Sequence, residues 1–199
     1  MPQISISWLD HIELSPKDGL GTQAAIAKTL RKQLVAALEG QGFAPADLVR
    51  CVYVIRMSGD FLVAYPWGNS PVLYIGRGAA FDRLSVHMKR WLHEVEGFGK
   101  DVCIQIRVCR PRRKNSAEMF KYVEADLIAR FAKKFGSIPF FNSRREWSFE
   151  EGVDYTDTDE KQLRASIGVG SGKRPRWAIA PTPANRNYEV YHRGHDKSE

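Results

Sequence analysis

Apolar side chains recur every three or four residues in three parts of the chain, which is the spacing of one helix face. These parts span residues 22–39, 80–95 and 116–135. Gly136 and Pro139 follow the last of them, and both are residue types that end helices. The pattern therefore predicts three amphipathic helices.

The first predicted helix has its own start and stop signals. Thr22 can cap its amino terminus, and Gly40 can end it. Its apolar stripe consists of Ile26, Leu30, Leu34 and Leu38. We expect this stripe to cover the core of the same molecule; the alternative is a contact between two copies of the chain in a homodimer.

Four other segments have the composition or the alternation of β-strands, namely residues 49–57, 61–65, 72–75 and 102–109. Short turn-like sequences separate the first three, which favours a meander of antiparallel strands. Residues 3–14 fit either a strand or an extended arm. Together with the helices, these segments predict an α+β protein with a small antiparallel sheet flanked by helices.

The order of the segments predicts one main domain with additions at both ends, since 199 residues are few for two independent cores. Residues 1–48 are expected to form an amino-terminal extension that contains the first helix, and residues 49–147 the core. Residues 148–199 begin with acidic side chains and continue without periodicity. We expect an acidic connector there, followed by a basic, largely irregular tail.

The charge of the chain indicates which kind of partner it binds. The formal net charge of +7 attracts polyanions, and nucleic acid is the obvious candidate. The three cysteines have neither the number nor the spacing of a disulfide framework or a zinc site. The sequence has no apolar run of membrane-spanning length and no signal peptide, which predicts a cytoplasmic protein without a membrane partner.

Five elements that carry candidate chemistry follow one another along the predicted strands and helices. In order they are Cys51-Val52-Tyr53, Leu73-Tyr74-Ile75-Gly76, Arg83 with His87, Glu124, and Pro139 with Asn142. The second element contains an intact YIG tripeptide, and the first is a degenerate version of its partner motif. This order resembles the GIY-YIG endonuclease family, and the resemblance covers roughly residues 50–145.

The resemblance implies an endonuclease that uses one divalent metal ion, Mg²⁺ or Mn²⁺. It implies that Tyr53 takes a proton from the attacking water and that Tyr74 orients water or phosphate. Arg83 would stabilise charge on the phosphate in the transition state. Glu124 would be the metal ligand, and Asn142 would position the site through hydrogen bonds.

Elementary chemistry supports the same grouping. Arg83, His87 and Arg90 share one helix face because they are four and three residues apart, and such a face can hold a phosphate. A carboxylate such as Glu124 is the ligand that Mg²⁺ prefers, together with water and phosphate oxygens. A tyrosine pKa of about 10 makes Tyr53 a poor base at neutral pH unless a cation lies nearby.

The spacing of the two tyrosines departs from the family pattern. Twenty residues separate Tyr53 from Tyr74, so residues 58–70 look like an insertion into the short hairpin of the family. Cys51 also stands where the family has a glycine. A shift of one residue in the strand pairing would turn Tyr53 to the wrong face of the sheet.

Basic side chains near these motifs and in a loop after the fourth strand segment are expected to contact nucleic acid, with DNA as the expected substrate. They are Arg77, Arg90, Arg110, Arg112, Arg113 and Lys114. Two alternatives remain at this point. The chain could be an inactive GIY-YIG-like module that only binds nucleic acid, or a protein that regulates a partner through its first helix.

Overall fold

A five-stranded antiparallel sheet forms the centre of the protein in the computed structural model, which describes residues 4–16, 21–58, 61–98, 102–114, 116–143, 153–168 and 177–180. Its strands run in the order β1, β7, β3, β6, and β2 also pairs with β7. Their bounds are β1 Ser5–Trp8, β2 Ile12–Leu14, β3 Cys51–Ser58, β6 Val72–Gly78 and β7 Cys103–Arg112. Residues 3–14, for which a strand and an arm were equally compatible, therefore contribute two short strands.

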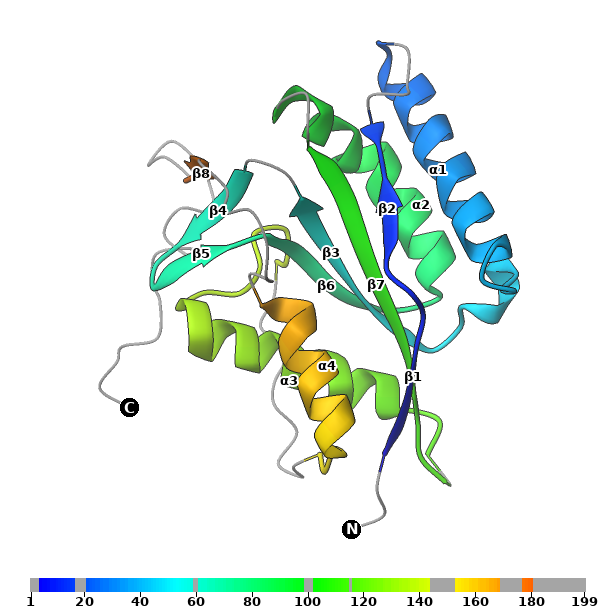
Figure 1. The fold of residues 1–199 in the computed structure, drawn as a ribbon, viewed down its shortest axis with the longest axis vertical. Helices are drawn as coiled ribbons and strands as arrows, with labels where there is room; N and C mark the ends of the chain where they lie inside the picture. The colour runs from blue at the N-terminus through cyan, green and yellow to red at the C-terminus, as the bar shows by residue number, and fades with distance from the viewer. Residues whose placement is uncertain are drawn as a thin grey trace.

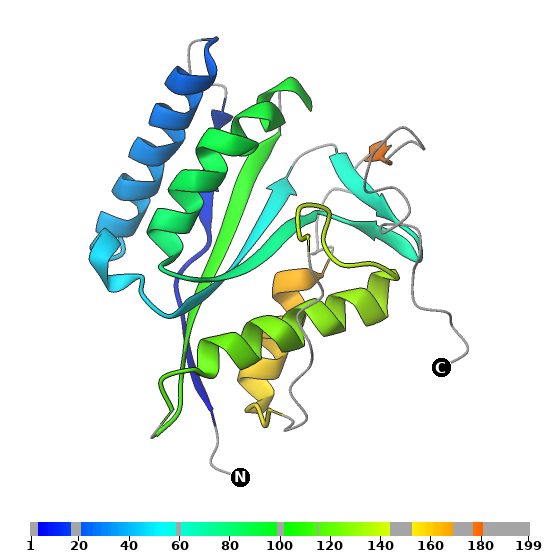
Figure 2. The same cartoon turned by 180° about the vertical axis from the view of Figure 1, so that it is seen from behind.

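Helices pack on both faces of this sheet (Figure 1, Figure 2). Helices α1 (Gln23–Glu39) and α2 (Ala80–Arg90) lie side by side on one face. Helices α3 (Met119–Phe135) and α4 (Asp157–Ile167) lie on the other. The arrangement confirms the predicted α+β class with an antiparallel sheet between helices.

Helix α1 forms as its sequence predicts. The Thr22 side chain accepts a hydrogen bond of 3.2 Å from the Ala25 N–H, which satisfies one of the unpaired donors of the first turn. The apolar stripe is buried against β2, α2 and the segment after α2. This confirms that the stripe covers the core of its own molecule.

The second predicted helix is shorter than its apolar pattern. Helix α2 ends at Arg90, and Trp91 leaves the helical conformation with φ −152° and ψ −24°. A 3₁₀ segment, η3 (Leu92–Phe98), follows. The prediction of one helix over residues 80–95 is therefore wrong beyond Arg90, because Leu92 and Val95 can be buried by either type of helix.

The predicted meander is also wrong, because β4 (Phe61–Tyr65) does not join the central sheet. It pairs with β5 (Gly68–Ser70) and, in parallel, with β8 (Trp177–Ile179) to form a second, three-stranded sheet. Tyr65 fastens this small sheet to the core: its ring packs edge-on against Phe131, and its hydroxyl donates to the Val72 carbonyl at 2.6 Å.

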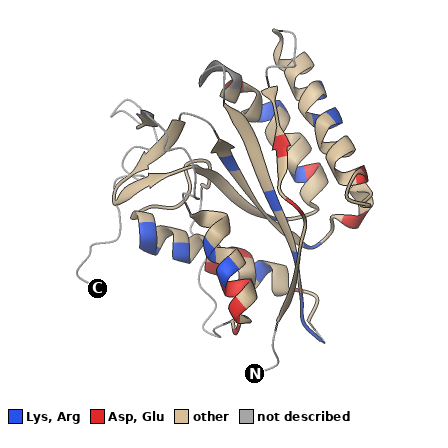
Figure 3. Ribbon diagram, in the orientation of Figure 1, with Lys and Arg blue, Asp and Glu red and all other residues tan. Residues whose placement is uncertain are grey.

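Residues 148–199 were expected to be an acidic connector and a largely irregular tail; the structure instead has helix α4 at residues 157–167, across the end of the connector and the start of the tail. Thr156 caps the helix, and acidic residues fill its first turn, where the helix dipole favours negative charge (Figure 3). The helix has only two buried apolar side chains, Leu163 and Ile167, and so lacks the stripe that reveals a helix in a sequence. Residues 144–152 and 181–199 lie outside the described part.

A buried arginine holds the end of α4 against the sheet. The Arg56 guanidinium, on β3, donates to the carbonyl oxygens of Ala165, Ser166 and Gly168 at 2.9, 3.0 and 2.7 Å. These carbonyls belong to the last turn of α4 and its cap, where the helix hydrogen-bond ladder ends, and the Ala165 carbonyl also accepts from the Gly168 N–H. We call this arrangement the Arg56 clamp.

Among the described residues, no helix is both long and apolar enough to cross a bilayer.

Candidate active site

The two motif tyrosines project from neighbouring strands onto the same face of the sheet. Tyr53 of β3 is paired with Gly76 of β6, and Tyr74 lies two residues before Gly76. Side chains two apart on a strand share a face, so both rings point toward α2. The pairing becomes irregular between Ile55 and Arg56, beyond the tyrosines, and the inserted β4–β5 strands therefore do not shift the register at Tyr53.

The glycine of the YIG tripeptide has a steric purpose. A Cβ atom on Gly76 would lie 2.4 Å from Cε1 of Tyr74 and 2.6 Å from the phenol oxygen of Tyr53. Both distances are far below van der Waals contact, so the two rings can cross β6 only above a residue without a side chain. Cys51, which stands where the family has a glycine, is buried opposite Gly78 and so finds space there.

Helix α2 brings an arginine and a histidine to the two phenols. The Nε2 atom of His87 lies 3.1 Å from the Tyr53 oxygen, and the His87 and Tyr74 ring centroids are 4.5 Å apart. Arg83, one turn earlier and exposed, has hydrogen-bonding interactions with the phenol groups of Tyr53 and Tyr74, which raise the pKa of its guanidinium. We call these four residues, predicted as site residues, the phenol cluster.

Burial sets the protonation of the phenol cluster. Burial raises the pKa of Tyr53 above its ordinary value; Tyr74 adds to this rise, and the Arg83 cation opposes it. The pKa of His87 is lowered to about 4, chiefly by burial and also by the positive charges of Arg83 and Arg90. Both Tyr53 and His87 are therefore uncharged at neutral pH, with Arg83 as the cation beside them.

Glu124 reaches the same strand from the opposite side. It is a buried residue of α3, and its Oε2 atom lies 2.9 Å from Nη1 of Arg77. Arg77 directly follows Gly76, so strand alternation directs its side chain toward α3, away from the face of Tyr74. Strand β6 is the edge of the central sheet, which leaves the Arg77–Glu124 pair and the phenol cluster on the two sides of one edge strand.

The carboxylate of Glu124 is a type of ligand that hard divalent cations prefer, and its Oε2 atom forms the ion pair with Arg77. Within the described ranges, no three or more His, Cys, Asp or Glu side chains gather as a metal site. A metal there would therefore depend on one protein carboxylate with water and phosphate oxygens. Arg77, expected to contact nucleic acid, has its guanidinium in this ion pair.

Asn142 is fixed to the outer edge of β6. Its side-chain oxygen accepts from the Ile75 N–H at 3.0 Å, and its side-chain nitrogen donates to the Ile75 carbonyl at 2.7 Å. The Phe141 N–H donates to the Leu73 carbonyl at 3.0 Å. The segment around Asn142 thus replaces a missing strand neighbour and holds β6 in position beneath the tyrosines.

Sequence reasoning assigned Trp91 to the core and missed its polar contact. The indole Nε1–H of Trp91 donates to Nδ1 of His87 at 3.1 Å, while the indole ring stacks on Phe141 with centroids 3.9 Å apart. Trp91 is four residues after His87, and this spacing was the signal that could have indicated the contact.

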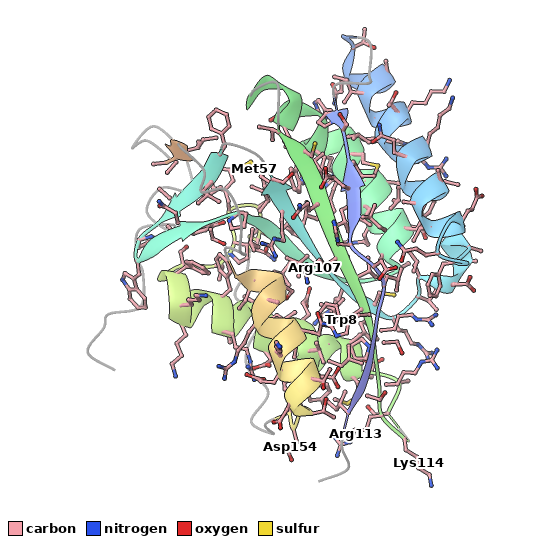
Figure 4. All side chains as sticks on the ribbon, viewed as in Figure 1. Trp8, Met57, Arg107, Arg113, Lys114 and Asp154 are labelled. Carbon is pink, nitrogen blue, oxygen red and sulfur yellow. The ribbon has the colours of Figure 1, made fainter. Side chains whose placement is uncertain are left out.

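The other predicted nucleic-acid contacts lie along β7 and on α2. Arg110 and Arg112 belong to β7, paired with Ser7 and Ser5 of β1, so the prediction of a basic loop is wrong for these two residues. The Arg110 guanidinium lies over the ring of Phe43. Figure 4 shows Arg113 and Lys114 beyond the strand, at one tip of the molecule.

Arg90 is exposed at the end of α2 and lowers the pKa of His87 through its charge. Arg83 and Arg90 are thus both exposed cations of α2. Comparison of the chain with models of known families, with characterised proteins and with solved structures finds no match in any of the three.

Proposed function

We propose that the protein is a metal-dependent endonuclease of the GIY-YIG type that hydrolyses phosphodiester bonds in nucleic acid, with DNA as the first substrate to test. The observation that carries the proposal is the phenol cluster. Two tyrosines from adjacent antiparallel strands meet an arginine and a histidine of the next helix above the glycine of the YIG tripeptide.

The chain path supports the same proposal. The β3–β6 pair is followed by α2, then by β7 on the other side of β3, and then by α3, which carries Glu124. Four of the five motif elements therefore lie on strands and helices, and Pro139 with Asn142 lies in the segment after α3. The β4–β5 insertion folds as a separate sheet and leaves the paired tyrosines in register.

The side chains present suit phosphodiester hydrolysis. The exposed Arg83 guanidinium offers a fork of N–H donors to a phosphate and to the charge that grows on it. The oxygen of Tyr53, once deprotonated, takes a proton from water as the water oxygen bonds to phosphorus. The bond from phosphorus to the leaving oxygen then breaks, and that oxygen takes a proton from solvent.

Glu124 would hold the divalent ion, Mg²⁺ or Mn²⁺, and the ion would supply positive charge to phosphate oxygens. The ion pair with Arg77 directs the carboxylate toward the edge strand. Asn142 maintains the backbone of Ile75, which lies between the two motif residues Tyr74 and Gly76.

One alternative has specific support, namely an inactive module that binds nucleic acid without cutting it. Burial raises the pKa of Tyr53, and Glu124 is engaged by a cation of the protein itself. Both features would slow catalysis while leaving the basic surface intact. A cleavage assay distinguishes the two functions, whereas a binding assay does not.

The test incubates supercoiled plasmid DNA, and separately a structured RNA, with the purified protein and Mg²⁺ or Mn²⁺. We expect nicking or linearisation that depends on the metal and is lost in Glu124→Gln, which keeps the size of the side chain. Glu118→Gln is the matched control, because Glu118 is an exposed residue at the start of α3 whose ion pair is with Lys121. A salt-sensitive gel shift without cleavage of either substrate would replace the nuclease by the binding module.

A further inference from the structure

A chain of three side chains ends at the oxygen of Tyr53. The Trp91 indole donates to Nδ1 of His87 at 3.1 Å, and Nε2 of the same ring lies 3.1 Å from the Tyr53 oxygen. The two contacts involve both ring nitrogens of His87, which is a buried residue. The direction of each hydrogen bond then follows from the donor capacities of the groups.

An indole nitrogen can only donate a hydrogen bond, so the nitrogen that receives it must carry a lone pair and no proton. Nδ1 of His87 is therefore unprotonated. A neutral imidazole has one N–H, which must then be on Nε2. The contact between His87 and Tyr53 consequently runs from Nε2–H to the phenol oxygen.

We propose that Trp91 is a positioning residue that fixes His87 as the Nε2–H tautomer, so that His87 donates to the Tyr53 oxygen and cannot accept the proton of that phenol. The tautomer follows from the geometry alone. Its consequence for cleavage rests on the proposed function, in which Tyr53 is the base.

Several contacts hold the indole in place. Trp91 leaves the helix just after Arg90, and its backbone N–H still bonds to the His87 carbonyl at 3.0 Å. Its ring stacks on Phe141 with an interplanar angle of 18°, and Phe141 is hydrogen-bonded to the backbone of β6. The indole is thus braced between the end of α2 and the strand that carries Tyr74.

The tautomer determines what Tyr53 can do. Its oxygen receives the His87 N–H and interacts with the Arg83 guanidinium, and two such donors favour the phenolate over the phenol. The hydroxyl hydrogen must point away from His87, so the proton of the phenol cannot pass to that ring. An opposite tautomer would accept that hydrogen and stabilise the phenol instead.

The charged and titratable groups around His87 agree with a neutral ring. Tyr53 and Tyr74 face it from the sheet, and Arg83 and Arg90 belong to its own helix. Both arginines disfavour a second positive charge, and burial lowers the pKa of His87 to about 4. The Trp91 N–H acts in the same direction, because a proton on Nδ1 would face another donor.

The direct test is nitrogen NMR of histidine-labelled protein at neutral pH. The chain has five histidines, and the signals of His87 are identified by their loss in His87→Gln. We expect Nε2 in the protonated range and Nδ1 in the unprotonated range. A proton on Nδ1, alone or together with one on Nε2, would overturn the proposal.

Trp91→Phe keeps a ring to stack on Phe141 but removes the N–H. We expect the His87 signals to move to a mixture of the two tautomers, and cleavage to fall roughly 10- to 100-fold with its pH profile displaced to higher pH. Trp67→Phe is the matched control, since the Trp67 ring lies beside Gly136 at the end of α3. Unchanged His87 signals in Trp91→Phe would remove Trp91 from this role.

Two substitutions at His87 separate donation from acceptance. Gln retains an N–H that can donate to Tyr53, whereas an ionised Glu can only accept. We expect His87→Gln to cleave at least about 10-fold faster than His87→Glu, and equal or reversed rates would contradict the proposal. If no variant and no wild-type protein cleaves, the nuclease proposal fails, while the NMR result still decides the tautomer.

Discussion

The central sheet buries polar groups on both of its faces, and the two faces use them differently. In the Arg56 clamp, the guanidinium donates to three carbonyls of α4 and is almost fully buried. In the phenol cluster, the buried Tyr53 and His87 share an exposed cation, Arg83, with solvent. A buried cation whose donors end on backbone stabilises the fold, whereas the exposed Arg83 cation remains accessible to a ligand.

Arg83→Met should have the largest effect, and on activity alone. Loss of the guanidinium removes the donor to phosphate and the charge that favours the Tyr53 phenolate, so we expect cleavage to fall about 10²- to 10³-fold. Because Arg83 is exposed, the free energy of unfolding should change by less than about 0.5 kcal/mol. Single-turnover cleavage and denaturant unfolding measure the two quantities. A large loss of stability with full activity would mean that Arg83 serves the fold rather than the reaction.

Arg56→Met should show the opposite behaviour. The carbonyls of Ala165, Ser166 and Gly168 would lose the Arg56 guanidinium, although Ala165 would keep the Gly168 N–H, and we expect the free energy of unfolding to fall by about 2–4 kcal/mol. The rate constant for cleavage by the folded fraction should stay close to that of the wild type. Arg107→Met, on β7 but on the same sheet face as Arg56 and only partly buried, is the control and should change stability by less than about 1 kcal/mol.

Gly76→Ala tests whether the close approach of the two phenols is structural as well as functional. The added Cβ would lie within 2.6 Å of both tyrosine side chains, so we expect a loss of about 3 kcal/mol in the free energy of unfolding, together with loss of cleavage. Gly40→Ala is the control, since Gly40 has an ordinary helical conformation. A crystal structure of the Gly76 variant with both rings unmoved would refute the steric argument.

The protonation of His87 should appear in the pH dependence of stability. Its pKa is about 4 in the folded protein and about 6.5 in the unfolded chain, so the unfolded chain binds the proton first as the pH falls. Its contribution to stability is therefore complete above about pH 6.5 and declines toward pH 4, by about 2 kcal/mol at pH 5. The difference between wild type and His87→Gln, measured by denaturant unfolding at pH 7 and pH 5, isolates this residue. Parallel pH profiles would show that folding does not lower the pKa of His87.

The smallest effect is expected away from both sheet faces. Replacing Arg112 or Arg113 by Ala should weaken DNA binding across sequences and reduce the slope of log affinity against log salt by about 1 each. Lys28→Ala on the exposed side of α1 is the control. Unchanged affinity would leave the end of β7 as a solvated turn and restrict the binding surface to the neighbourhood of the phenol cluster.

The sequence by itself determined the features that depend on neighbours along the chain. The apolar repeat and Thr22 defined α1, Gly136 ended α3, and the spacing of Arg83 and His87 put both on one helix face. These signals are local because hydrogen bonds within a helix join residues four apart. The same periodicity failed where a helix has little apolar surface, as in α4.

Only the tertiary structure decided which distant segments meet. Strand alternation could not show that β4 leaves the central sheet, that Arg110 and Arg112 pair with β1, or that Glu124 engages Arg77. Nor could it show that Trp91 turns its N–H to His87. Each of these contacts depends on how separate elements pack, and a repeat of two or of three to four residues carries no information about the partner.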